Sequence, residues 1–158
     1  MAERAVAPVV GVTTMVLVTV VLAALVGGMF FGIELDDPPE ASIAADASYD
    51  AATGQTYVEL THLTGDTLDV VALTIRISVN GERLEHQPPV PFFSVTGFDG
   101  GPTGPFNSGA SETTWEAGER AGLTIAGSND PVPTPGDVIS VRVFAEGYSV
   151  ATVQTTVR

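Results

Sequence analysis

The sequence has no cysteine, no lysine and only two histidines. Without cysteine the chain forms no disulfide and offers no thiolate to a substrate or a metal ion, so a folded domain must rest on its own apolar core. His62 and His86 show none of the local spacing of a catalytic triad or a zinc site. We therefore expect a protein that is not an enzyme and that binds no cofactor and no metal.

Positive charge is also scarce. The chain has six basic residues, all arginine, and 19 acidic residues, which gives a formal net charge of −13. This balance argues against nucleic acid as a partner, since phosphate contacts need clustered lysine and arginine. Carboxylates that hold water, with their repulsion screened by salt, are typical of a halophile's surface. We interpret the charge as a solvated acidic surface rather than as a cation site.

Charge of either sign is absent from residues 5–33, and this apolar run divides the chain. As a helix with a rise of ~1.5 Å per residue, the run would reach ~43 Å, more than the ~30 Å hydrocarbon layer of a membrane. The hydroxyls of Thr13, Thr14 and Thr19 can bond back to helix carbonyls. The apolar stretch of a cleaved secretory signal is shorter, at ~7–15 residues. The run therefore predicts a transmembrane helix that stays on the protein.

The domain boundaries follow from this division. We expect the hydrophobic helix over residues 5–35 and a hinge over residues 36–41 (DDPPEA), because the paired prolines cannot continue a helix. Residues 42–158 then form an ectodomain. The acidic residues that follow the run indicate that the N-terminus lies inside the cell and the ectodomain outside.

The ectodomain has the pattern of a β protein. Aliphatic and polar residues alternate over 74–79 and 138–144, which is typical of half-buried antiparallel strands. Asn80-Gly81 and Glu146-Gly147 stand where hairpin turns are expected. The fold class is therefore α+β, a long N-terminal hydrophobic α-helix followed by an all-β, immunoglobulin-like antiparallel sandwich. We expect strands at 42–49, 56–63, 68–79, 83–86, 92–95, 121–126, 138–146 and 149–157.

Residues 87–118 interrupt the regular pattern, because prolines and glycines are mixed there with five aromatic residues. The segment is predicted to be a long irregular loop. Its aromatic side chains either form an exposed surface for contact or fix the loop on the sandwich, and we favour the second interpretation. These residues are Phe92, Phe93, Phe98, Phe106 and Trp115.

A family resemblance begins at Arg4. The segment RAVAPVVGVTTMVLVTVVLAALVGGMFFG places a charged residue before a small residue, followed by valines, an early proline and a glycine. This segment resembles the N-terminal domain of archaeal type IV pilins, particularly the haloarchaeal ones. The later segment VELTHLTGDTLDVVALTIRISVNGERL is similar, less specifically, to a strand, turn and strand of haloarchaeal pilins.

The resemblance implies a precursor with a leader of residues 1–4, cut by a prepilin peptidase between Arg4 and Ala5. It also implies that the helix assembles into the core of a surface filament used for adhesion. The implied partners are identical or related pilin subunits, the prepilin peptidase and the pilus assembly platform. The precursor would lie in the cell membrane and the mature subunit in an extracellular pilus. The core positions would be Ala5, Val6, Pro8, Val9, Val10, Gly11, Val12, Met15, Val16, Leu17, Val20, Leu22, Leu25, Met29 and Phe30.

The residues leave one alternative open. A plain membrane anchor needs the same uncharged run, so the chain also fits an uncleaved, single-span β-sandwich binding module at the cell surface. In that case residues 1–4 remain attached and the loop aromatics meet a ligand.

Overall fold

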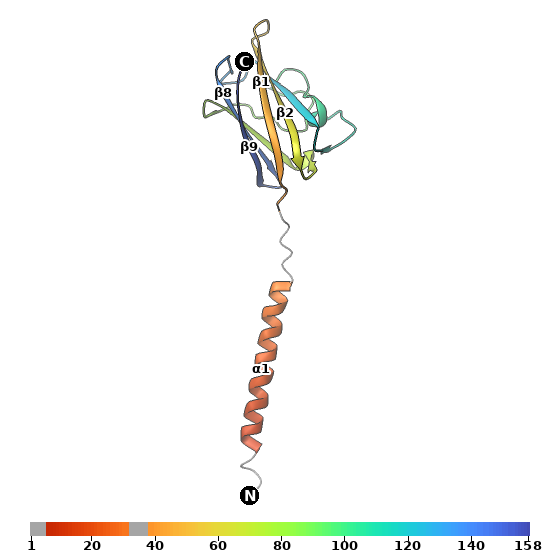
Figure 1. Cartoon of the computed structure of the whole chain (residues 1–158), viewed down its shortest axis with the longest axis vertical. Helices are drawn as coiled ribbons and strands as arrows, with labels where there is room; N and C mark the ends of the chain where they lie inside the picture. The colour runs from red at the N-terminus through yellow and green to blue at the C-terminus, as the bar shows by residue number, and fades with distance from the viewer. Residues whose placement is uncertain (1–5, 32–37) are drawn as a thin grey trace. The chain divides into compact units, whose positions relative to one another are not determined.

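The computed structural model describes residues 6–31 and 38–158. The chain forms two compact units, residues 1–37 and residues 38–158, and each is described by itself (Figure 1). The expected leader, the cleavage site and the first two residues of the expected hinge, 36 and 37, lie outside the described residues.

The first unit contains one helix, α1 (Val6–Phe31), of 26 residues and without a charged side chain. The Thr14 hydroxyl donates to the Val10 carbonyl at 2.8 Å, and the Thr19 hydroxyl donates to the Met15 carbonyl at 2.8 Å. Thr13 makes similar bonds within the helix. Because these hydroxyls find partners in the helix itself, they do not stop α1 from lying in an apolar medium.

The second unit, the head, contains two larger antiparallel sheets and a small two-stranded one (Figure 1). In the order β1-β2-β7, the first sheet contains β1 (Ala41–Asp50), β2 (Gln55–Gly65) and β7 (Arg120–Ile125). In the order β5-β4-β8-β9, the second contains β5 (Glu82–Arg83), β4 (Leu73–Val79), β8 (Val138–Ala145) and β9 (Tyr148–Thr156). In immunoglobulin nomenclature, β1, β2 and β7 correspond to strands A, B and E. β5, β4, β8 and β9 correspond to strands C′, C, F and G. The two sheets therefore have the strand order of an immunoglobulin-like sandwich. The predicted fold class is confirmed.

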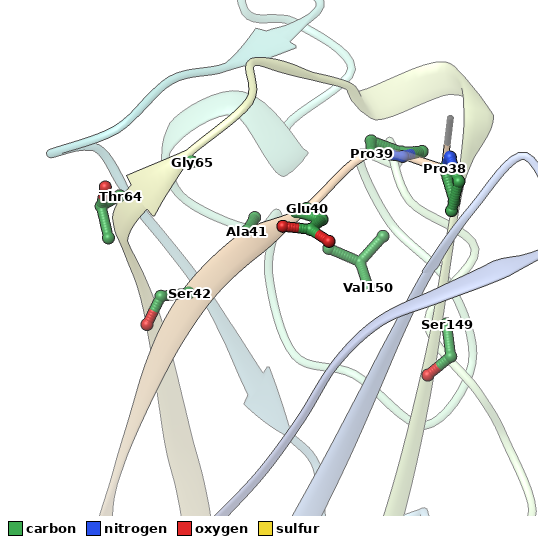
Figure 2. Close-up of a pocket in the computed structure, with 9 residues that line it drawn as sticks. All are labelled: Pro38, Pro39, Glu40, Ala41, Ser42, Thr64, Gly65, Ser149 and Val150. Carbon is green, nitrogen blue, oxygen red and sulfur yellow. The ribbon is translucent and has the colours of Figure 1, made fainter. Parts of the chain in front are cut away.

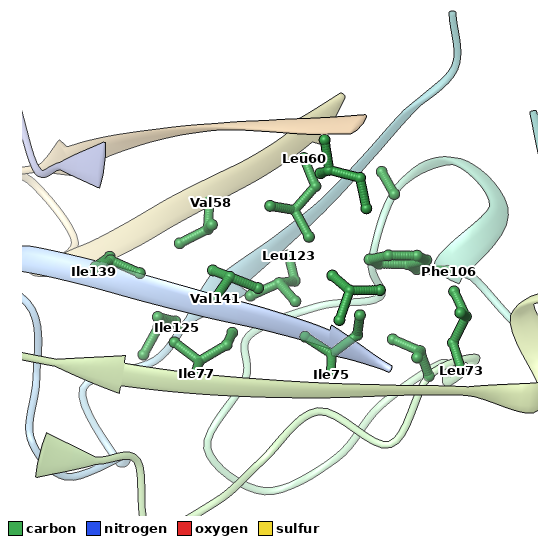
Figure 3. Packing of buried hydrophobic residues seen from close by; sticks show 14 of the residues in the cluster. Val58, Leu60, Leu73, Ile75, Ile77, Phe106, Leu123, Ile125, Ile139 and Val141 are labelled. Carbon is green, nitrogen blue, oxygen red and sulfur yellow. The ribbon is translucent and has the colours of Figure 1, made fainter. Parts of the chain in front are cut away.

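The core lies between the two sheets, where their inward positions meet (Figure 3). β4 and β8 each bury every second residue, and the buried residues of β4 lie directly opposite the buried residues of β8. The cluster takes in Val58, Leu60, Ile75, Ile77, Leu123, Ile125, Ile139 and Val141. Full burial of such a side chain contributes ~1.5–3 kcal/mol. The head therefore holds a continuous apolar core without any disulfide.

Both predicted hairpin turns are present. Asn80 and Gly81 have φ of 50° and 87°, and Glu146 and Gly147 have φ of 53° and 89°. Positive φ at both central positions marks a type I′ turn, whose twist matches that of the flanking strands. These turns set the register of β4 with β5 and of β8 with β9.

Several expected strands are corrected by the structure. The strand expected over 68–79 is divided by a 3₁₀ turn, η2 (Val70–Ala72), because the Asp69 carboxylate accepts from the Val71 amide at 3.0 Å. Only its first part, β3 (Leu68–Asp69), pairs with β6 (Thr114–Trp115), a strand that the sequence did not predict.

Three further boundaries differ from expectation. Residues 92–95 form no strand, and Phe92 makes only an isolated bridge to Asn107. The strand expected at 83–86 is the short β5, which ends at Arg83. Ala41 begins β1 opposite Gly65, so the last residue of the expected hinge belongs to the sheet.

Candidate functional site: the apolar helix and the surface of the head

The surface of α1 is apolar on every side. Among the described residues, α1 is the one helix that is long and apolar enough to cross a membrane, by length and composition, over Val9–Gly28. None of that segment is buried within the chain, and Met15 is 76% exposed. A helix that is apolar all round is suited to lipid or to the interior of a helix bundle. α1 therefore needs an apolar medium or apolar partners around it.

The expected core positions do not fall on one stripe of the helix. Val9, Val10, Gly11 and Val12 are consecutive and exposed, and four consecutive residues go once round a helix with 3.6 residues per turn. Met15, Val16, Leu17, Val20, Leu22 and Leu25 are exposed as well. Neighbouring subunits or lipid would therefore contact α1 on several sides of the helix.

The other expected positions are less fully described. Val6, Pro8, Met29 and Phe30 lie within α1, but their side chains are outside the described part of the structure, and Ala5 precedes it.

Four rings of the aromatic loop form two pairs inside the head. Phe106 and Trp115 are completely buried, with ring centroids 5.0 Å apart in an edge-to-face arrangement. Phe92 and Phe98 are also buried and lie 5.7 Å apart. Phe93 alone of the five is on the surface, 69% exposed. A contact surface made of all five rings is thus corrected to Phe93 by itself, because the other four fill the core.

Trp115 also organises the polar groups beneath the loop. Its indole N–H donates to the Glu119 carbonyl at 3.2 Å, and its own carbonyl lies 3.1 Å from Nδ1 of the buried His62. Nε2 of His62 has no hydrogen-bond partner among the described residues. The His62 ring packs edge-on against the Trp115 ring, with the ring centroids 5.4 Å apart. The described residues contain no group of three or more potential metal ligands.

Hydrogen bonds hold the start of the loop. Asn129 is buried, and its side-chain amide donates to the carbonyls of His86 at 3.0 Å and Gly97 at 3.1 Å. Thr103 then bridges to Gly122, so the loop lies along the outer edge of β7. Covering an edge strand prevents it from pairing with another chain. Sequence analysis missed Asn129, whose single amide gives no local signal of this role.

A hollow in the surface of the head lies where β1 begins (Figure 2). It has a volume of about 540 Å³ and is open to solvent. Glu40 supplies its one carboxylate, and the lining has no histidine or arginine. Val150 and the two prolines Pro38 and Pro39 give it a partly apolar wall. The hollow therefore offers no paired acid and base for catalysis.

Two exposed carboxylates have lowered pKa values. The Thr134 amide, the Asn80 side-chain amide and the Thr134 hydroxyl all donate to Asp137, which holds the pKa of its carboxyl below the ordinary value. The pKa of Asp50 is lowered in the same way, first by the Ala52 amide and then by the Thr53 hydroxyl. Both groups fix turns, and neither lines the hollow at the start of β1.

No family model matches the chain. An uncharacterised protein of Archaeoglobus fulgidus is 29% identical over 127 residues, which are 80% of this chain and 77% of that protein.

Two solved structures are similar in shape. The archaellum periplasmic stator protein FlaG from Sulfolobus acidocaldarius has a TM-score of 0.45 at 10% identity, over 73% of this chain and 97% of FlaG. The archaeal flagellum of Methanospirillum hungatei strain JF1 has a TM-score of 0.49 at 15% identity, over 96% of this chain and 91% of the other. Because both TM-scores are below 0.5, these similarities carry no argument about function.

Sequence analysis also missed a cluster of arginines on the head. Arg76 and Arg142 lie opposite each other in the register of β4 and β8, and both are exposed. Each occupies a polar position in the two alternating segments that predicted these strands. That alternation fixed the face on which each arginine lies, but not that the two strands are neighbours.

Proposed function

We propose that this protein is a structural subunit, a pilin, of an archaeal type IV pilus, and that it has no catalytic role. A prepilin peptidase cuts the precursor between Arg4 and Ala5, and the mature chain assembles through α1 into an adhesive filament on the cell surface. The acidic excess and the absence of lysine fit a haloarchaeal source.

The observation that carries this proposal is the uncovered surface of α1. Twelve large apolar side chains between Val9 and Val26 are each at least half exposed in the single chain. Soluble proteins rarely leave such contiguous apolar surface open, and larger patches mark membrane or protein contacts. Lipid covers this surface in the precursor, and the helices of neighbouring subunits cover it in the filament.

The proposal is tested by following the protein in cells that contain or lack the prepilin peptidase. With the peptidase, we expect the chain in filaments that shear releases from the cell surface. Without it, we expect the chain only in the membrane. A distribution that does not depend on the peptidase contradicts the proposal and supports the uncleaved membrane-anchored binding module.

Gly11 provides a second test, which concerns contacts between helices. A Cβ atom at Gly11 meets no other atom within 4 Å, so a larger apolar residue fits the single chain. Small residues let helices approach closely, and a bulky one keeps them apart. We expect Gly11→Leu to remain in the membrane and to give far fewer filaments, whereas the control Val12→Leu assembles. Equal assembly of both variants would show that no helix packs closely at Gly11.

A further inference from the structure

The outer face of the sheet β5-β4-β8-β9 is free of acidic residues on its three long strands. β4, β8 and β9 contain no aspartate and no glutamate, although the chain has 19 acidic residues. The same face carries Arg76 on β4 and Arg142 on β8, both exposed. Arg83 on β5 lies opposite Ser78, an outward position of β4. We call this surface the arginine face.

These arginines have no carboxylate partner within the described part of the chain. The ion pairs there join Arg120 to Glu59 at 3.1 Å and Arg158 to Asp46 at 3.2 Å. None of the three arginines of the arginine face takes part in them.

The position of Arg76 and Arg142 works against the stability of the isolated head. Residues directly opposite in an antiparallel pair have Cβ atoms ~4.5–5.5 Å apart and point to the same side, and like charges there are destabilising. Proteins keep side-chain arrangements that destabilise the fold mainly at functional sites. The pair therefore indicates an anionic partner outside this chain.

The opposite sheet has the complementary charge. Asp46 and Asp50 are exposed on the outer side of β1, alternating with the buried Ala47 and the half-buried Tyr49. Asp46 pairs with Arg158, but the two side chains are 69% and 80% exposed, and such surface pairs contribute little. Asp46 can therefore exchange this partner for another arginine.

We propose that the arginine face of one copy binds the acidic outer side of β1 of the next copy. This inference rests on the proposed filament function. A contact between two different surfaces of the same chain is heterologous, and repetition of such a contact builds an open helical assembly rather than a closed dimer. The charges steer neighbouring heads into register, while α1 supplies the apolar contacts.

The test compares two single variants that remove the same charge. R142Q changes the arginine face, and the control R120Q changes an arginine that pairs with Glu59 and lies outside both proposed contact surfaces. We expect R142Q to lower the yield of sheared filaments about tenfold, and the control to change it little. Equal yields from the two variants would overturn the inference.

Two controls separate this outcome from other failures. The melting temperature of R142Q should be no lower than that of the wild type, so a lost filament is not a lost fold. If the wild type itself forms no filament, the proposed function fails. If the wild type assembles and R142Q and R120Q do not differ, only the arginine face fails.

A cross-link tests the partner directly. Because the chain has no cysteine, Thr152→Cys gives a single attachment point, and Thr152 lies opposite Arg142 on the arginine face. A maleimide-benzophenone probe on this cysteine should join two copies in intact filaments, with the second attachment within residues 41–50. Dimers joined elsewhere, or cross-links only to a different protein, would contradict the proposal.

Discussion

Replacing Trp115 with alanine should destabilise the head severely. The indole is completely buried against Phe106 and His62, at centroid distances of 5.0 and 5.4 Å. Removal of such a side chain costs ~3–5 kcal/mol. For a head of 121 residues, this is a large share of the ~6–18 kcal/mol expected in total. It corresponds to a fall in melting temperature of about 12–20 °C.

Trp115→Phe should cost less, for a reason that is visible in the hydrogen bonds. The Glu119 carbonyl accepts from the indole N–H and also from the His62 amide at 3.0 Å. The phenylalanine variant therefore leaves no buried acceptor without a partner. The remaining cost comes from the smaller ring of phenylalanine, and we expect the free energy of unfolding to fall by ~1–3 kcal/mol.

The measurement is thermal unfolding of the detergent-solubilised full chain, followed by far-ultraviolet circular dichroism. Trp115 is the single tryptophan of the chain, so its fluorescence gives an independent unfolding curve for the wild type. Phe93→Ala is the matched control from the same loop, because Phe93 is exposed, and it should change stability by less than ~0.5 kcal/mol. If Trp115→Ala cost no more than Phe93→Ala, the loop would not be fixed by its buried aromatic residues.

Three further predictions concern the head. Because the pKa of Asp137 is lower in the folded chain than its ordinary value of 3.8, the carboxylate stabilises the fold above pH 3.8, and this contribution is lost as the pH falls through the folded-state pKa. Asp137→Asn should therefore make the free energy of unfolding, measured with urea, depend less on pH on the acid side. Gly122→Ala places a methyl group against the Tyr57 hydroxyl and should cost ~1–3 kcal/mol, whereas Gly127→Ala, with no atom within 4 Å, should melt near the wild type. Arg142→Thr removes the like-charged cross-strand pair and should raise stability by ~0.2–1 kcal/mol at low salt.

The parts of the fold that the sequence predicted depend on local chemistry. α1 followed from an uninterrupted run without charge, and that signal needs no knowledge of neighbouring segments. The turns at Asn80-Gly81 and Glu146-Gly147 followed from residues that accept positive φ. β4 and β8 followed from their alternation, because each buries one side of its strand.

The features that the sequence did not predict depend on segments far apart in the chain. β3 pairs with β6, with the buried Leu68 opposite the buried Trp115, and neither residue signals the other in the sequence. The 3₁₀ turn after Asp69 interrupts an apolar segment that looks like one strand, because a single side chain caps it.

The candidate site shows the same division between local and distant signals. The apolar surface of α1 was predicted, since every side of the helix is apolar. The buried positions of Phe106 and Trp115 were favoured but not fixed, because an aromatic residue in a loop fits a core and a contact surface equally well. The arginine face could not be predicted, because only the pairing of β4 with β8 brings its two arginines together.

The central claim is that the chain is cut before Ala5 and released from the membrane in filaments. Its most direct test is the intact mass, with N-terminal peptide sequencing, of protein sheared from cells that express the full chain. The account predicts a mature chain that begins at Ala5 in the sheared fraction. A chain that retains residues 1–4 and is found only in the membrane would contradict it.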